Sequence, residues 1–144
     1  MAQTAEAVKK ARPGENMRLI DALGYRLPLA GIVSILHRAS GLVMFILLPF
    51  IIWMFDTSVT SEITYSQFTS VFTSGTGFLP GWLYKLVALA LIWAFLHHLI
   101  AGLRHLWMDA THAVTLQFGR SSAVFTLVVS VATTLALGAK LFFF

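Results

Sequence analysis

The sequence predicts an all-α membrane protein with three transmembrane helices, its N-terminus on the inner side and its C-terminus on the outer side. Apolar residues make up 58% of the 144 residues and the mean hydropathy is +0.81, more than soluble folds usually carry. They are grouped in three runs long enough to cross a hydrocarbon core of about 30 Å. Lys and Arg precede the first run and are missing from the segment after it, which sets the expected orientation.

Residues 1–28 form a polar arm, and residues 29–144 form the expected three-helix anchor domain. The arm has no apolar run of the length that a signal-peptide core needs, so we expect it to stay on the side where it is made. It mixes basic with acidic residues, which favours a bacterial cytoplasmic arm over a mitochondrial targeting segment. The expected location is therefore the bacterial inner membrane, with the mitochondrial inner membrane as the alternative.

The first span is expected at about residues 29–55. Its polar residues include a set with the i, i+3, i+4, i+7 spacing of one helix face, namely Ser34, His37, Arg38 and Gly41. A polar face inside a membrane indicates a partner or a ligand. The alternative is that the two basic side chains only reach to the inner headgroups. Pro49 lies inside the span and predicts a kink near residues 45–49.

The segment over residues 56–81 is rich in Ser, Thr and Gly and contains no Lys or Arg. This composition predicts an outer loop. A short interfacial helix at about Tyr65 to Phe72 is compatible with the sequence, which does not decide it.

The second span is expected at about residues 82–106 and the third at residues 123–144, with an inner loop over 107–122. Trp82 at the outer end of the second span and Trp107 at its inner end match the aromatic belts of membrane helices.

A second polar stripe occupies the inner half of the second span. His98 and His105 are seven residues apart and fall within about 20° of each other on a helix, with Gly102 between them. A glycine lets a flat partner approach the backbone, and a histidine one turn away offers it a nitrogen ligand. Haem fits this pattern. The alternatives are that Gly102 only admits a neighbouring helix and that His98 only donates to a backbone carbonyl.

The two stripes are expected at the same depth. His37 and Arg38 lie about 10 to 14 Å above the inner end of the first span, and His98 lies about 12 Å above Leu106. Side by side, the stripes form a pocket suited to an anionic cofactor such as haem with its propionates. His98 and His105 are about 10.5 Å apart on one helix and cannot both bind one iron. A second ligand must come from another helix, and depth alone allows His37.

The composition also excludes several functions. Cysteine is absent, so the chain itself holds no disulfide, thiolate metal site or cysteine-ligated iron–sulfur cluster. No phosphate-binding glycine loop, carboxylate pair or Ser/His/Asp set indicates catalytic residues. The net charge of +4 does not indicate a nucleic-acid partner, because membrane orientation explains it better. Three candidate functions remain: a redox anchor, a small transporter or channel subunit, and a purely structural membrane subunit.

Two segments carry a family resemblance: Ser34-Ile35-Leu36-His37-Arg38-Ala39-Ser40-Gly41 and His98-Leu99-Ile100-Ala101-Gly102-Leu103-Arg104-His105-Leu106-Trp107-Met108-Asp109. They resemble the two signature segments of succinate dehydrogenase cytochrome b556 subunits, the larger membrane anchors of respiratory complex II, over about residues 25–140. The resemblance implies membrane lipid, a second small anchor subunit, an iron–sulfur subunit and a flavoprotein subunit as partners. It implies electron transfer to ubiquinone, with a menaquinol-using fumarate reductase anchor as the alternative.

The resemblance also implies a haem b site. His98 is similar to the axial ligand of the haem iron, whose other ligand is a histidine of the partner anchor. His37, Arg38 and His105 match positions beside the haem propionates.

The resemblance further implies a quinone site. Ser34 and Arg38 match the serine and arginine of that site, and Asp109 matches an acidic residue close to it. One departure lies upstream: many members have a Ser-Pro-His-Leu segment where this chain has Tyr25-Arg26-Leu27-Pro28.

Overall fold

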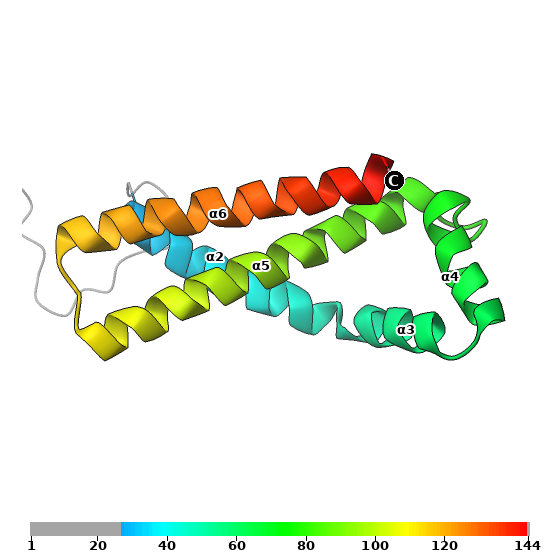
Figure 1. Ribbon diagram of the computed structural model, residues 1–144, viewed down its shortest axis with the longest axis horizontal. Coiled ribbons are helices and arrows are strands. Elements are labelled where there is room, and N and C mark those ends of the chain that lie inside the picture. The colour runs from blue at the N-terminus through cyan, green and yellow to red at the C-terminus, as the bar shows by residue number, and fades with distance from the viewer. Residues whose placement is uncertain (1–26, 144) are drawn as a thin grey trace, which may run out of the picture.

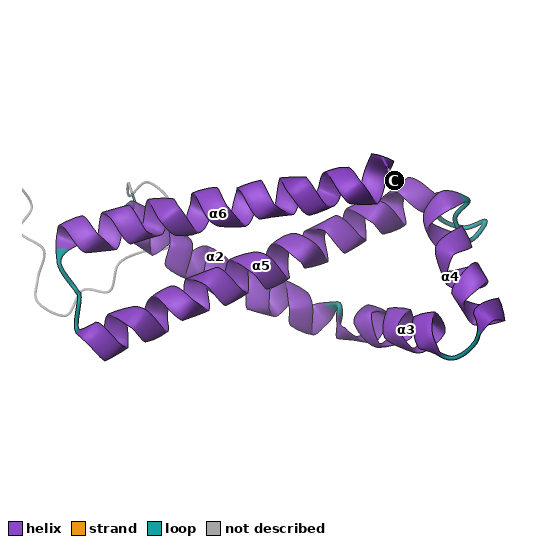
Figure 2. Cartoon of the chain, in the orientation of Figure 1, coloured by secondary structure: helices purple, strands orange, loops and turns teal. Residues whose placement is uncertain are grey.

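The computed structural model describes residues 27–143, which form five helices and no strand (Figures 1 and 2). The helices are α2 (Leu29–Ile46), α3 (Leu48–Val59), α4 (Glu62–Thr73), α5 (Gly81–Thr111) and α6 (Leu116–Phe143). Of these, α2, α5 and α6 are long and apolar enough to cross a membrane. The expected all-α class with three spans is confirmed. The arm before residue 27, and with it most of the expected N-terminal charge, lies outside the described residues.

The first apolar run is divided at Leu47, which separates α2 from α3. Leu47 has φ −87° and ψ 6°, outside helical geometry, and Pro49 follows in the first turn of α3. A proline has no N–H to continue the helix and its ring clashes with the carbonyl four residues earlier. The predicted kink is confirmed. The 18 residues of α2 rise about 27 Å, so α3 carries the apolar run to the far side.

The segment after α3 contains a helix, α4, that is longer than the short one considered from the sequence. Its first turn is closed by a capping box in which Ser61 and Thr64 bond each other's backbone N–H. A turn follows, and α5 begins at Gly81, where a Cβ would lie 2.7 Å from the carbonyl oxygen of Phe72. Glycine therefore allows α4 to lie against the start of α5 (Figure 1).

The connection between α5 and α6 is short. The loop expected over residues 107–122 is wrong in its extent, because α5 continues to Thr111 and α6 begins at Leu116. His112 ends α5 with a left-handed φ of 54°. The sequence reasoning equated polar residues with a loop, but a helix continues past the apolar region when nothing breaks its backbone hydrogen bonds.

The central helix is α5, which runs antiparallel to α6 and is crossed by α2 (Figure 1). Val33, Ala101 and Ala123 are fully buried where the three helices meet. Such small side chains let membrane helices approach closely. Large apolar side chains such as Phe45 and Leu135 are exposed, as expected for surfaces that face lipid.

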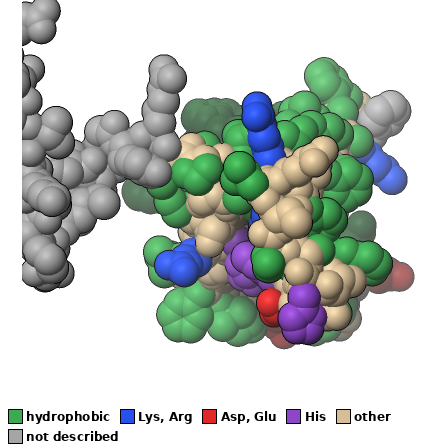
Figure 3. All heavy atoms as spheres, turned by 90° about the vertical axis from the view of Figure 1, so that its left-hand side faces the viewer, with side chains coloured by type: hydrophobic (Ala, Val, Ile, Leu, Met, Phe, Trp, Pro, Cys, Tyr) green, Lys and Arg blue, Asp and Glu red, His purple; other side chains and the backbone are tan. Residues whose placement is uncertain are grey.

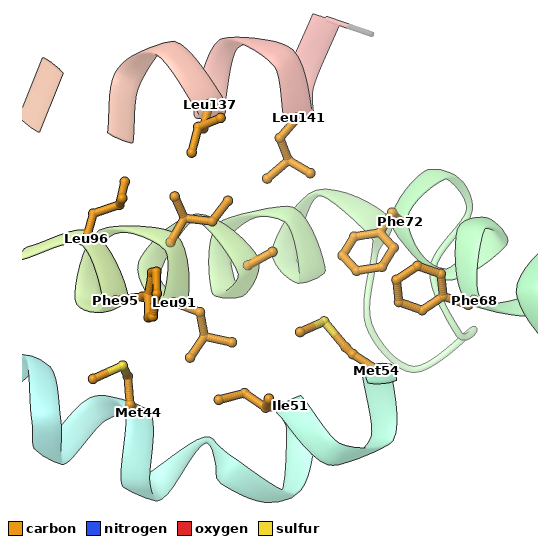
Figure 4. A pocket seen from close by; sticks show the side chains of 12 residues that line it. Met44, Ile51, Met54, Phe68, Phe72, Leu91, Phe95, Leu96, Leu137 and Leu141 are labelled. Atoms are coloured by element: carbon orange, nitrogen blue, oxygen red, sulfur yellow. The ribbon is translucent and has the colours of Figure 1, made fainter. Parts of the chain in front are cut away.

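An apolar cavity of about 630 Å³ lies at the end of the molecule that carries α3 and α4. Figure 4 shows Phe68 and Phe72 of α4, Leu141 of α6 and Met54 of α3 around the stretch of α5 that carries Leu91. The lining side chains are all apolar. The histidines of α2 and α5 and Arg104 lie toward the other end, where α5 meets α6.

Candidate functional site

His98 is held in a defined orientation by α2. Its Nδ1 lies 3.0 Å from the carbonyl oxygen of His37 and 3.3 Å from Ser40 Oγ, and Ser40 Oγ donates to that carbonyl at 2.8 Å. A carbonyl only accepts, so Nδ1 carries the proton and Nε2 keeps a lone pair. Metal-binding histidines are typically held by such a bond from the other ring nitrogen. The bond considered as an alternative to ligation is thus present and leaves Nε2 able to bind a metal.

Three imidazoles line the contact between α2 and α5. The rings of His37 and His98 are stacked, with centroids 4.1 Å apart and planes at 23°, and His105 lies 5.3 Å from His37. Two rings stacked face to face cannot approach one iron from opposite sides. This arrangement therefore does not support His37 as the second axial ligand. In residues 27–143, no group of three or more His, Cys, Asp or Glu could hold a metal ion on its own.

Two glycines allow this close packing of rings against backbone. A Cβ on Gly41 would lie 3.0 Å from Cε1 of His98, and one on Gly102 would lie 3.6 Å from Nε2 of His37. The space left by the missing side chain of Gly102 is therefore filled by the imidazole of His37. This matches the alternative in which the glycine admits a neighbouring helix, because α2 packs directly on α5 here.

The three predicted quinone-site residues lie toward the same end of the molecule. Arg38 is exposed on α2, and Ser34, one turn earlier, is half-buried. Asp109 is exposed near the end of α5, and its neighbour Met108 lines a cavity together with Leu29 at the start of α2. Within the described residues, no hydrogen bond joins these three side chains.

Arg104 lies on a different face from the one expected. It is the neighbour of His105 in the second motif, but its Nε donates to Ser122 Oγ at 2.9 Å and its Nη2 donates to the carbonyl of Gly119 at 3.2 Å, both on α6. One residue changes direction by about 100° on a helix, so Arg104 and His105 face different neighbours. In the described part of the chain, Arg104 makes no bond with Asp109.

The sequence reasoning missed a buried polar contact between α5 and α6. His97 is 0% exposed and stacks on Trp93, and its Nδ1 lies 3.2 Å from Ser130 Oγ, which donates to the carbonyl of Leu127. Its Nε2 has no hydrogen-bond partner among residues 27–143. A signal was present in α6, where small polar residues recur every four positions at Thr126, Ser130 and Thr134.

The fold and the site define a class: a three-span helical membrane subunit that presents an oriented imidazole beside basic side chains. The chain belongs to the succinate dehydrogenase/fumarate reductase transmembrane subunit family, whose model matches residues 18–137. Membership makes it a multi-pass membrane anchor of the complex II type and confirms the resemblance carried by the two motifs.

Two relatives are named succinate dehydrogenase cytochrome b556 subunit. The one from Paracoccus denitrificans is 32% identical over 99 residues, covering 69% of this chain and 71% of the relative. The one from Coxiella burnetii (strain RSA 493 / Nine Mile phase I) is 32% identical over 111 residues, covering 77% of this chain and 84% of the relative. Both matches extend over most of the helical domain.

Proposed function

We propose that this chain is the haem b- and quinone-binding anchor of a succinate dehydrogenase and passes electrons from an iron–sulfur subunit to ubiquinone. The observation that carries the proposal is the orientation of His98, whose Nδ1 bond to the carbonyl of His37 leaves Nε2 available as a ligand. The names of the two relatives favour succinate dehydrogenase over fumarate reductase.

The residues around His98 are of the kinds that hold a haem, and the ring of His37, which now fills the space beside Gly102, would move aside for it. His98 would supply one axial ligand, and His37, Arg38 and His105 would lie beside the propionates, where positive charge and N–H donors stabilise carboxylates. Ser40 and the carbonyl of His37 would hold the ligand ring still. Haem b, when bound, supplies a one-electron redox centre.

The quinone would be bound by Ser34 and Arg38, with Asp109 nearby. Ser34 and Arg38 are four residues apart on α2 and so lie on one face, where the hydroxyl can donate to one quinone oxygen. The guanidinium stays charged and presents donors in a fixed plane, so it can stabilise negative charge on that oxygen. Asp109, exposed at the end of α5, would relay protons from the inner aqueous phase.

The proposal requires a second anchor subunit. His98 and His105 share one helix, and His37 stacks on His98, so the second axial ligand would come from a histidine of that partner. The iron–sulfur and flavoprotein subunits would bind on the inner face of the bacterial inner membrane, the side on which we place the start of α2. The chain would thus have its N-terminus inside and its C-terminus outside.

Co-expression tests the proposal. An ionised side chain exposed to lipid at mid-depth costs about 2.5–3.5 kcal/mol, so the chain alone should express poorly and bind little haem. A second small hydrophobic subunit that contributes a histidine should restore both, because a shared cofactor stabilises each chain. The readouts are haem per polypeptide and the reduced-minus-oxidised spectrum of the purified complex. A six-coordinate haem protein formed by this chain alone contradicts the shared site, and a complex without a b-type haem favours a transporter or purely structural subunit.

A further inference from the structure

Arg104 is a buried cation whose bonds go to neutral groups. It is 9% exposed, and its two hydrogen bonds within residues 27–143 are to the hydroxyl of Ser122 and the carbonyl of Gly119. Arginine stays protonated in proteins, and a buried ion without an opposite charge is strongly unfavourable. A counter-ion is therefore expected at this position.

The described acidic residues do not supply that counter-ion. Asp56 and Glu62 lie at the far end of the molecule, where α3 ends and α4 begins. Asp109 is exposed and is five residues after Arg104 on α5, which turns its side chain away by about 140°. The negative charge must come from outside residues 27–143.

Two cavities meet the side chain of Arg104, and they differ in polarity. One, of about 580 Å³, lies at the α5–α6 turn and is also lined by Arg120, Thr115 and Leu29. The other, of about 600 Å³, runs between α5 and α6 and is lined mainly by apolar side chains such as Phe125. Figure 3 shows this end of the molecule, where basic side chains emerge among hydrophobic ones.

We propose that Arg104 and Arg120 bind the phosphate of an anionic phospholipid at the α5–α6 turn. A guanidinium pairs with phosphate oxygens through two parallel N–H bonds. Arg120 is the fifth residue of α6, and the first turn of that helix adds the positive end of a helix dipole. The apolar cavity on the other side of Arg104 receives an acyl chain.

The apolar cavity favours a lipid over a carboxylate from another protein. A carboxylate would neutralise Arg104 but would leave the space between α5 and α6 unfilled. Trp107 also lines that space, and tryptophan is enriched at the depth of the headgroups, where lipid phosphates lie. This site is on the α6 side of α5 and is separate from the histidines that face α2.

The test uses the whole complex, freed of lipid in detergent and returned to nanodiscs of phosphatidylcholine with or without phosphatidylglycerol. Native mass spectrometry then counts retained phosphatidylglycerol. The wild type should retain it. Arg104→Gln should bind it about tenfold more weakly, equivalent to about 1.4 kcal/mol. Arg120→Gln, whose side chain is exposed and can be changed without disturbing the core, should weaken binding in the same direction. Lys140→Gln, exposed at the other end of α6, is the matched control and should behave as wild type.

Three outcomes would overturn the proposal. Equal retention by wild type and Arg120→Gln would show that the turn does not bind the phosphate. Full displacement of the lipid by millimolar inorganic phosphate would show a site for a free anion. Asp21 is an acidic residue of the N-terminal arm. If Asp21→Asn destabilises the complex as much as Arg104→Gln and lipid binding is unchanged in both, the counter-ion is a carboxylate of that arm. Haem content is not the readout, so these results are independent of the proposed redox function.

Discussion

His97 and His98 are neighbours on α5, and their surroundings are opposite. His97 is fully buried against α6 and bonds Ser130, whereas His98 is half-buried beside α2 and bonds the carbonyl of His37. Both rings bond through Nδ1. The difference is at Nε2, which in His97 is enclosed without a partner in the described residues. Nε2 of His98 is not enclosed in this way.

The contrast separates two uses of a histidine inside a membrane. One face of α5 packs against α6, and its polar groups, including Arg104, bond side chains of that helix. The adjacent face, about 100° away, bears His98 and His105 and borders the outer surface of the three-helix unit. The haem that we propose to be shared with another subunit would bind on the second face. Substitutions on the two faces should therefore have different effects.

The largest effect is expected from His98→Leu, which removes the proposed axial ligand. Haem per polypeptide should fall by about tenfold or more, since even losing a group that orients a ligand costs 10- to 100-fold in metal affinity. His97→Leu is the matched control and should retain haem. Pyridine haemochrome assays on the purified complexes measure both. Equal loss in the two variants, or no loss in His98→Leu, would contradict the assignment.

Arg38→Lys tests the chemistry of the face that borders α2. The change keeps the charge and loses the planar set of donors, so quinone reduction should fall by about tenfold with little change in haem. Succinate-to-quinone activity is compared with succinate oxidation by an artificial dye that bypasses the quinone. A parallel fall in both activities would assign Arg38 to assembly instead.

Gly41→Ala tests how closely α2 positions the ring of His98. The added Cβ would lie 3.0 Å from Cε1, so the ring must shift by a few tenths of an ångström. A distorted side-chain torsion costs about 0.5–1.5 kcal/mol, so haem affinity should fall by about threefold. Gly31→Ala, on the same helix, is the control, because its Cβ would make an ordinary 3.6 Å contact with Pro28. Identical haem titrations for both variants would show that the ring position does not matter.

Ser130→Ala tests the buried face and should leave haem unchanged. It removes the acceptor of His97 Nδ1–H, and an unpaired buried donor costs about 1–3 kcal/mol. The purified complex should therefore unfold at a lower temperature. His97→Leu should cost less, because it also removes the unpartnered Nε2. If Ser130→Ala lowers haem content as much as stability, the two faces of α5 are not separate.

The sequence by itself determined the class, the three spans, the kink at Pro49 and the family, because each depends on local or periodic signals. Apolar length, proline chemistry and two contiguous motifs can be read without knowing which helices touch. It also placed His98 and His105 on one face, since helical periodicity fixes that relation. The helical extent of residues 107–122 was not predicted, because polar composition does not distinguish a loop from a helix that continues into the interface.

Only the tertiary structure decided which neighbour each face of α5 meets. Periodicity gives the angle between His97, His98 and Arg104 but not the position of α2 and α6 around the helix. Three features depend on that position: the stacking of His37 on His98, the contact of His37 with Gly102 and the bonds of Arg104 to α6. Helix packing in a membrane is set by close contacts of small residues far apart in the sequence, such as Val33, Ala101 and Ala123, so no single segment encodes it.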